Sequence, residues 1–226
     1  MQAVALYRSS IGKKALMALT GLIWVGYVVM HMYGNLKAFT GSEHFNEYAE
    51  GLRYLGAPIF GHLHLLTIAR IVLVASIGIH IWAAYTLFVQ ARQARPSSYA
   101  SRRVVQANYA SITMRYGGTV ILLFVLYHLV HLTWGIGGIH ADYVRGDAYH
   151  NLLVGFRSLP VVILYLAALV ALGLHLFHGT WSMFQTLGLN DSNWDGAFRA
   201  LAWILAIVVP VGFAAVPIAI QLGIIA

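Results

Sequence analysis

The sequence contains no cysteine and very few charged residues. Only 9% of its 226 residues are Asp, Glu, Lys or Arg, against roughly 25% in a typical soluble domain. The lack of cysteine excludes disulfides, thiolate-held iron–sulfur clusters and cysteine-ligated zinc within this chain. The scarcity of charge, with 60% hydrophobic residues, leaves too little polar surface to face water. Both features together predict a membrane protein.

Long apolar runs are the main feature that is present. Runs long enough to cross a hydrocarbon layer of ~30 Å occur five times. They lie at about residues 15–35, 65–89, 116–137, 159–186 and 198–222. All five are expected to be helices, because an open sheet leaves backbone groups unpaired in lipid. We therefore expect an all-α membrane protein that forms a single domain over residues 1–226. No cleavable signal peptide is evident before the first span.

Local signals between the runs predict shorter features. Pro160 suits the first turn of the fourth helix, and residues 192–195 (Ser-Asn-Trp-Asp) have the pattern of a capping box before the fifth. The connection after the first span is too long for a bare loop. Its residues 42–55 have apolar side chains at helical spacing, which predicts a short helix on the membrane surface.

Basic residues are distributed unevenly between the two sides that five spans define. One side receives nine basic and two acidic residues, and the other receives four basic and five acidic residues. The basic residues of the first side are Arg8, Lys13, Lys14, Arg92, Arg95, Arg102, Arg103, Arg115 and Arg199. The positive-inside rule places this side, with the N-terminus, in the cytoplasm and the C-terminus outside the cell membrane. The net charge of +7 is thus a topology signal, and nucleic-acid binding is not expected.

Histidines within the spans are the strongest functional signal. The chain has eleven histidines, and six of them fall in the first four predicted spans: His31, His80, His128, His131, His175 and His178. An ionisable residue in a transmembrane helix is costly and usually faces a cavity, a partner or a cofactor. For any one of them, a hydrogen bond to a neighbouring helix is the alternative.

The depths of these histidines suggest two sites. His31 and His128 lie near the outer ends of their spans, at ~9 Å and ~12 Å, whereas His80 and His175 lie ~12–17 Å from the inner ends. Two pairs at two depths are what two bis-histidine haems stacked along the membrane normal require. The expected fold is accordingly a four-helix bundle that holds two haems, with a fifth helix beside it.

Arg70 is the other costly residue within a span. It lies a few residues inside the outer end of the second span. Its guanidinium either extends to the interface or pairs with a propionate of the outer haem. On the inner side the same two alternatives hold for Arg8, Lys13, Lys14 and Arg115.

Four stretches of the sequence carry a family resemblance. They are residues 26–35, which include His31, residues 70–82, which include His80, residues 118–131, and residues 174–182. In this order they resemble the di-haem cytochrome b subunits of succinate:quinone oxidoreductases, the succinate dehydrogenases and fumarate reductases, over essentially the whole chain. The resemblance selects His128 over His131 and His175 over His178 as ligands. It also implies the pairs His31/His128 for the outer haem and His80/His175 for the inner haem.

The resemblance implies a membrane anchor that conducts electrons. A flavoprotein subunit would oxidise succinate, an iron–sulfur subunit would pass electrons to the inner haem b, and this chain would deliver them to a quinone, commonly menaquinone. Neither the succinate site nor a catalytic residue is expected here. Some members carry a glutamate, linked to proton transfer, where this chain has Gly173. Glu47 and Glu50 are candidates for an acidic residue near an outer quinone site.

Two alternatives remain open at this stage. One is a di-haem quinone-linked cytochrome b that serves a hydrogenase or a formate dehydrogenase. The other is a haem-free transporter whose histidines relay protons or bind a metal. Broken helices at the middle of the membrane would favour a transporter, and the sequence has no paired Pro/Gly interruptions.

Overall fold

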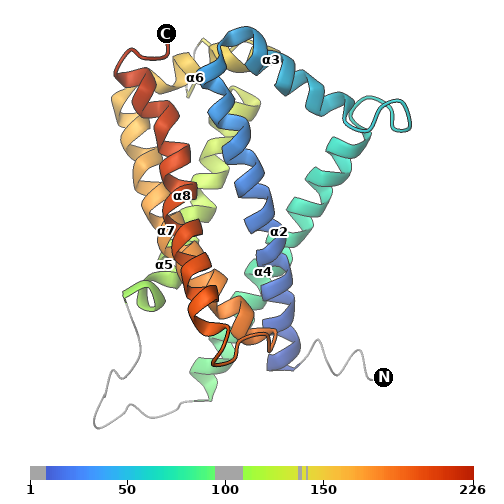
Figure 1. Cartoon of the computed structure of the whole chain (residues 1–226), viewed down its shortest axis with the longest axis vertical. Helices are drawn as coiled ribbons and strands as arrows, with labels where there is room; N and C mark the ends of the chain where they lie inside the picture. Colours follow the sequence, from blue (N-terminus) through green and yellow to red (C-terminus); the bar gives the residue numbers. More distant parts are fainter. Residues whose placement is uncertain (1–8, 95–108, 137–138, 141) are drawn as a thin grey trace.

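The fold is a set of long, roughly parallel and antiparallel helices (Figure 1). A computed structural model describes residues 9–94, 109–136, 139–140 and 142–226. Within these residues there is no strand, and five helices are long and apolar enough to cross a membrane. They are α2 (Ser10–Leu36), α4 (His64–Gln93), α5 (Tyr109–His128) with its extension η3 (Leu129–Trp134), α7 (Leu159–Thr186) and α8 (Asp195–Gln221). The predicted all-α membrane class is confirmed.

The helix bounds follow the predicted spans closely, with differences at the ends. The fourth span coincides with α7, which has Pro160 in its first turn. Helix α2 begins before the predicted residue 15, because the Ser9 side chain accepts a hydrogen bond from the Gly12 N–H at 3.0 Å and caps it. The third span was predicted to end at residue 137, which lies outside the described residues.

The predicted capping box before the fifth span is wrong in its capping residue. Helix α8 begins at Asp195, and no side chain caps it at Trp194. Instead, the Asp191 carboxylate accepts hydrogen bonds from the N–H groups of Asn193 (2.8 Å) and Trp194 (3.1 Å). A carboxylate one residue earlier takes the role that the pattern gave to Ser192, since Asp and Ser are both good acceptors for free N–H groups.

Helices α2 and α7 connect the bundle. Helix α2 contacts α4, α7 and α8, and α7 contacts α2, α5 and α8. Helices α2 and α4 cross near the start of α2 and separate toward the end that bears α3 (Figure 1). That end, which also carries α6 and the end of α8, is called here the C-terminal side, and the opposite end the N-terminal side.

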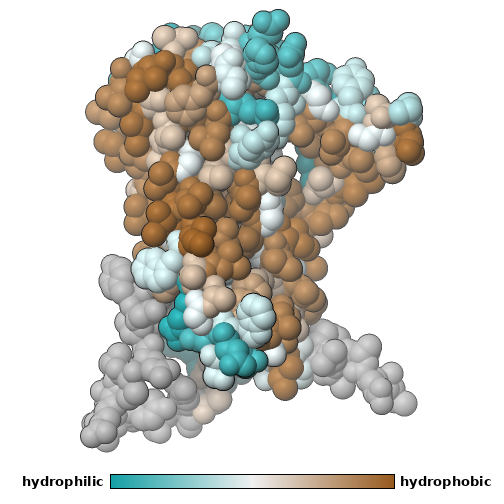
Figure 2. Space-filling view, viewed as in Figure 1, coloured by the Kyte–Doolittle hydropathy of each residue, from teal (hydrophilic) through white to brown (hydrophobic). Residues whose placement is uncertain are grey.

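The outward surface of the long helices is apolar. Large side chains such as Val74 (71% exposed) and Val170 (66% exposed) point away from the protein. Figure 2 shows a hydrophobic belt between the two ends, with hydrophilic residues gathered over α3 and at the opposite end. A belt of this extent is not expected on a water-soluble monomer. The chain is therefore a multi-pass membrane protein.

Two short helices cover the C-terminal side. Helix α3 (Ser42–Gly51) with η2 (Leu52–Tyr54) confirms the short helix predicted at residues 42–55, and α6 (Ala148–Phe156) lies in the connection before α7. Tyr48 of α3 packs on α2 at Gly34, where a Cβ would lie 3.0 Å from the tyrosine ring. The absence of a side chain at Gly34 thus permits this close contact.

Asn46 joins α3 to α6 through hydrogen bonds. Its Nδ2 donates to Oδ1 of Asp147 at 3.0 Å, and its Oδ1 accepts from the Tyr149 N–H at 3.0 Å. The same Asp147 oxygen accepts from the His150 N–H and caps α6. These two donors, first the His150 amide and then Asn46, lower the pKa of the Asp147 carboxyl.

Replacing Asn46 with alanine is expected to loosen α6 from α3. The loss of both hydrogen bonds should cost roughly 1–2 kcal/mol, or about a tenfold faster exchange of the Tyr149 amide hydrogen. Hydrogen exchange in detergent at neutral pH measures this, with Glu43→Ala on the exposed face of α3 as the control. Because the Asp147 pKa is depressed, its contribution is complete above the ordinary value of about 3.9 and is lost as pH falls through the depressed value. Unchanged exchange at Tyr149 would contradict the assignment.

Candidate functional site: two histidine pairs between helices

The first pair joins α2 to α5. The ring centroids of His31 and His128 lie 5.8 Å apart, with an angle of 83° between the ring planes. His31 stacks on Tyr27 at 5.3 Å and contacts Phe213 of α8 at 5.5 Å. His31 is five residues from the end of α2, so this pair lies toward the C-terminal side.

The second pair joins α4 to α7, nearer the N-terminal side. The ring centroids of His80 and His175 lie 6.3 Å apart. Nδ1 of His80 is 3.1 Å from the Met17 carbonyl oxygen and 3.2 Å from the Thr20 hydroxyl of α2. Because a carbonyl oxygen only accepts, the His80 proton belongs on Nδ1, which leaves the lone pair of Nε2 available for a metal. Nδ1 of His175 is buried and has no hydrogen-bond partner among the described residues.

The neighbouring histidines are not part of these pairs. His131, which is 1% exposed, lies against His140 with ring centroids 4.9 Å apart. A Cβ at Gly155 would lie 2.9 Å from its ring, so His131 fills a tight space on the α6 side. His178 makes no ring contact with His80 among the described residues, and its Nδ1 is buried without a partner. The structure thus brings together the histidines that the sequence paired.

Two glycines lie at the level of the second pair, one on α2 and one on α5. A Cβ at Gly21 of α2 would lie 3.5 Å from Cε1 of His80, and a Cβ at Gly118 of α5 would lie 3.6 Å from Cε1 of His175. Each glycine precedes a histidine of the first pair, His31 or His128, by ten residues. At 1.5 Å per residue, both helices give a separation of about 15 Å between the two levels.

The geometry of both pairs fits a bis-imidazole metal centre. Metal–nitrogen bonds of about 2 Å on each side, with about 1 Å more to each ring centre, put two such rings roughly 6 Å apart. The observed separations of 5.8 Å and 6.3 Å agree with this value. The donor set is neutral nitrogen, which haem iron accepts.

The predicted cationic residues lie at the periphery of the pairs. Arg70 is exposed on α4 and lies within electrostatic range of the Tyr27 hydroxyl, which belongs to the ring stack on His31. Lys13 is buried, with its Nζ 5.9 Å from the centre of the Trp82 ring. The Arg115 guanidinium lies 4.7 Å over Phe88. Arg8 is outside the described residues.

The acidic candidates on the C-terminal side differ in their contacts. Glu50 forms an ion pair with Arg53, whereas Glu47 is exposed on α3. At Gly173 a Cβ would lie 2.9 Å from the Ala206 carbonyl oxygen of α8. A glutamate at this position would therefore require α7 and α8 to separate.

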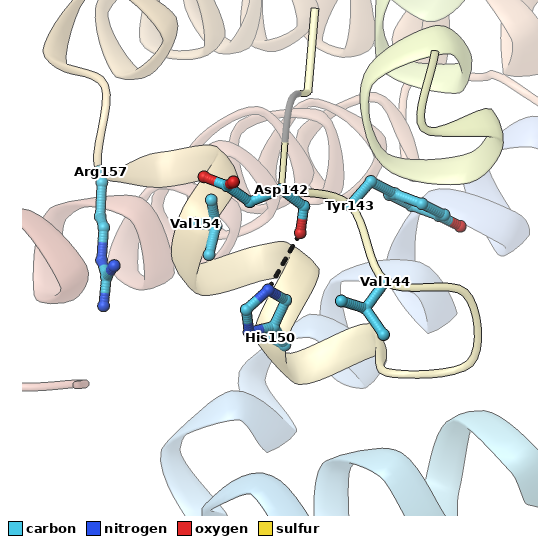
Figure 3. Close-up of a pocket in the computed structure, with 6 residues that line it drawn as sticks. All are labelled: Asp142, Tyr143, Val144, His150, Val154 and Arg157. Atoms are coloured by element: carbon cyan, nitrogen blue, oxygen red, sulfur yellow. Dashed lines mark hydrogen bonds between the residues drawn. The ribbon is translucent and has the colours of Figure 1, made fainter. Parts of the chain in front are cut away.

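A pocket of about 450 Å³ opens elsewhere, beside α6. Figure 3 shows its lining, in which Nε2 of His150 donates to the Asp142 carbonyl oxygen at 3.0 Å. None of its lining residues belongs to either histidine pair. An apolar hollow of about 280 Å³ between α5 and α7 does reach His175, so the second pair lies close to the lipid-facing surface.

Tyr165 of α7 is a site residue that sequence reasoning missed. Its hydroxyl lies 3.3 Å from Nδ1 of His128 and 2.9 Å from Nδ1 of His131. A signal was present, because Tyr165 precedes His175 by ten residues, the same spacing that separates the two levels on α2 and α5. Arg70 precedes His80 by ten residues as well. On each of α2, α4, α5 and α7, one residue therefore lies at the level of the first pair: His31, Arg70, His128 and Tyr165.

Comparison of the chain with protein-family models, with curated proteins and with solved structures finds no match. The class of protein is defined by the fold, an all-helical multi-pass membrane protein.

Proposed function

We propose that the chain is the membrane-anchor cytochrome b subunit of a succinate:quinone oxidoreductase and holds two b haems. The observation that carries the proposal is the facing of His31 with His128 and of His80 with His175, at two levels of one helical bundle. A haem iron takes four ligands from its porphyrin, so each site needs two protein ligands. Each pair supplies two neutral imidazoles from two different helices.

The residues around each pair would hold the ligands in place. The Met17 carbonyl fixes the His80 ring by accepting its Nδ1–H, and the glycines at positions 21 and 118 keep the space beside His80 and His175 free of side chains. Such outer contacts orient a metal-binding imidazole and raise its basicity. When bound, haem supplies one-electron transfer. The chain itself contributes the spacing, the exclusion of water and the apolar surroundings.

The iron–sulfur subunit would dock on the N-terminal side, which is expected to be cytoplasmic. Lys14, Arg92 and Arg115 are exposed there, and charge complementarity steers the assembly of partners. Arg95, Arg102 and Arg103, which the sequence assigns to the same surface, lie outside the described residues. Electrons from a flavoprotein subunit would reach this side first and then cross about 15 Å to the level of His31.

We propose that the quinone binds near the C-terminal side, at the first pair. In the di-haem family this quinone is commonly menaquinone. The alternative position is at the second pair, beside Ser10, Lys14 and Trp181. The Trp181 indole is already engaged there, because its N–H donates to Oδ1 of Asp195 at 3.1 Å and Arg199 lies 4.2 Å over its ring. Because Trp181 already makes these contacts, it is less available to a quinone, which favours the C-terminal side as the position of the quinone.

Collapsing the membrane potential is expected to slow succinate-driven quinone reduction severalfold. Electrons would move from the negative cytoplasmic side toward the positive outside, so the potential assists the transfer, by about 2.3 kcal/mol for each charge that crosses 100 mV. The measurement is quinone reduction in sealed vesicles with and without an uncoupler, with detergent-opened vesicles as the control. An equal rate in both conditions would place the quinone at the second pair.

The soluble partner decides between the proposal and its alternatives. A tagged chain purified from native membranes is expected to bring a flavoprotein and an iron–sulfur protein with it and to reduce quinone with succinate. Activity with hydrogen or formate instead would indicate the other di-haem cytochromes. A chain that purifies without haem and without partners would favour a transporter and contradict the proposal.

A further inference from the structure

A single hydroxyl connects two histidines near the C-terminal side. The Tyr165 oxygen lies 3.3 Å from Nδ1 of His128 and 2.9 Å from Nδ1 of His131, and Tyr165 is only 6% exposed. In a buried place each of these polar atoms needs its partner, because an unpaired group there costs about 1–3 kcal/mol.

The direction of the two hydrogen bonds follows from counting protons. A tyrosine hydroxyl has one proton to donate and can also accept. Because the two Nδ1 atoms are its only hydrogen-bond partners among the described residues, its proton goes to one of them and the other donates to it. If His128 binds iron, the nitrogen left free for the metal is Nε2, and its proton must be on Nδ1. His128 then donates to Tyr165, and Tyr165 donates to His131. The reverse order would leave a proton on Nε2 of His128 and block the metal.

We propose that Tyr165 is a positioning residue for the haem ligand His128, with His131 as the acceptor that orients the tyrosine hydroxyl. This inference rests on the proposed function. The arrangement matches that of the second pair, where the Met17 carbonyl accepts the proton of His80. One ligand in each pair thereby has a defined acceptor for its Nδ1–H: a backbone carbonyl for His80 and a side chain for His128.

The surroundings of Tyr165 hold its ring in place without the hydroxyl. The ring packs edge-to-face on Phe124 at 4.8 Å and on Phe156 at 4.7 Å. His131 is held in turn, because its carbonyl oxygen accepts a hydrogen bond from Nδ1 of His140 at 3.0 Å. Tyr165→Phe therefore removes the hydrogen bonds and keeps the packing.

The inference predicts a change in one haem alone. Without its acceptor, His128 gives less electron density to the iron, which favours the reduced state. Loss of such a contact typically changes a metal site by tenfold or more, and a tenfold shift in the ratio of reduced to oxidised haem is about 59 mV for a one-electron couple. Tyr165→Phe should raise the midpoint potential of the His31–His128 haem by this amount and leave the other haem unchanged.

Potentiometric titration of the purified holoprotein tests the inference. Tyr127→Phe is the matched control: its ring stacks on His131 at 5.5 Å, but its hydroxyl makes no hydrogen bond with another described residue. It should leave both potentials unchanged. The two haems are assigned with the His31→Ala protein. If Tyr165→Phe does not accumulate, His131→Leu replaces it and should raise the same potential by a smaller amount, since the tyrosine then lacks its acceptor.

The outcomes separate the inference from the function on which it rests. Two haems with unchanged potentials in Tyr165→Phe, or equal shifts in both haems, would overturn the positioning role. A wild-type protein without haem would instead overturn the proposed function.

Discussion

Alanine at His31 is expected to remove one haem of two and to leave the other spectrally intact. The same single loss is expected for His128→Ala, because the rings of these two residues face each other at 5.8 Å. His80→Ala and His175→Ala should each remove the other haem. The reason is that alanine cannot bind iron, and the remaining imidazole alone gives a weaker five-coordinate site.

The measurement is haem content per chain together with the low-temperature spectrum of each variant. His178→Ala is the matched control, because His178 lies one turn from His175 on α7 and has no ring contact with His80 in the described part of the chain. It should retain both haems. If His31→Ala and His80→Ala removed the same haem, or if His178→Ala removed one, the pairing would be wrong.

Leucine at Gly118 is expected to abolish the haem of the second pair without touching a ligand. The Cβ of an alanine there would lie 3.6 Å from Cε1 of His175, an ordinary contact, so Gly118→Ala should keep both haems. The side-chain carbons of leucine beyond Cβ would overlap the volume of the His175 ring, and a close-packed interior has no space for them. Gly21→Leu should have the same effect from the opposite helix, through His80.

Spectra of these glycine variants can be compared with Gly196→Leu, since no atom lies within 4 Å of a Cβ at Gly196. That control should keep both haems, and Gly118→Leu should keep the haem of His31 and His128. Retention of both haems in Gly118→Leu would show that His175 does not bind iron at the position that α5 restricts.

The spans and the depths of the histidines were accessible from the sequence because a small number of physical rules determine them. The choice of His128 over His131 and of His175 over His178 came from the family resemblance. Hydrocarbon thickness sets the minimum length of a helix that crosses the membrane. The apolar run at residues 159–186 exceeds that minimum, and α7 has the same bounds, Leu159–Thr186. Alternating chain direction and the constant rise of 1.5 Å per residue are enough to place His31 level with His128. That they face each other is a finding of the structure, and their binding of haem stays a prediction.

Other features depend on tertiary contacts that no local pattern reports. Before α8, the Asp191 carboxylate binds the N–H groups of the preceding turn, whereas the sequence pattern pointed to Ser192. Both side chains can accept from N–H groups, and the backbone path decides which one reaches them. The hydroxyl of Tyr165 lies within hydrogen-bond distance of His128, at the end of α5, and of His131, in the π-helical turn η3 that continues α5. No local sequence pattern reports this contact, because it depends on the packing of α5 against α7.

The presence of two haems is tested most directly by a reduced-minus-oxidised optical spectrum of the purified protein, with haem quantified against the chain. We expect b-type bands from two six-coordinate haems for each chain, both low-spin. A protein that is purified intact from its native membrane and carries no haem, or a single haem that survives replacement of either pair, would contradict it.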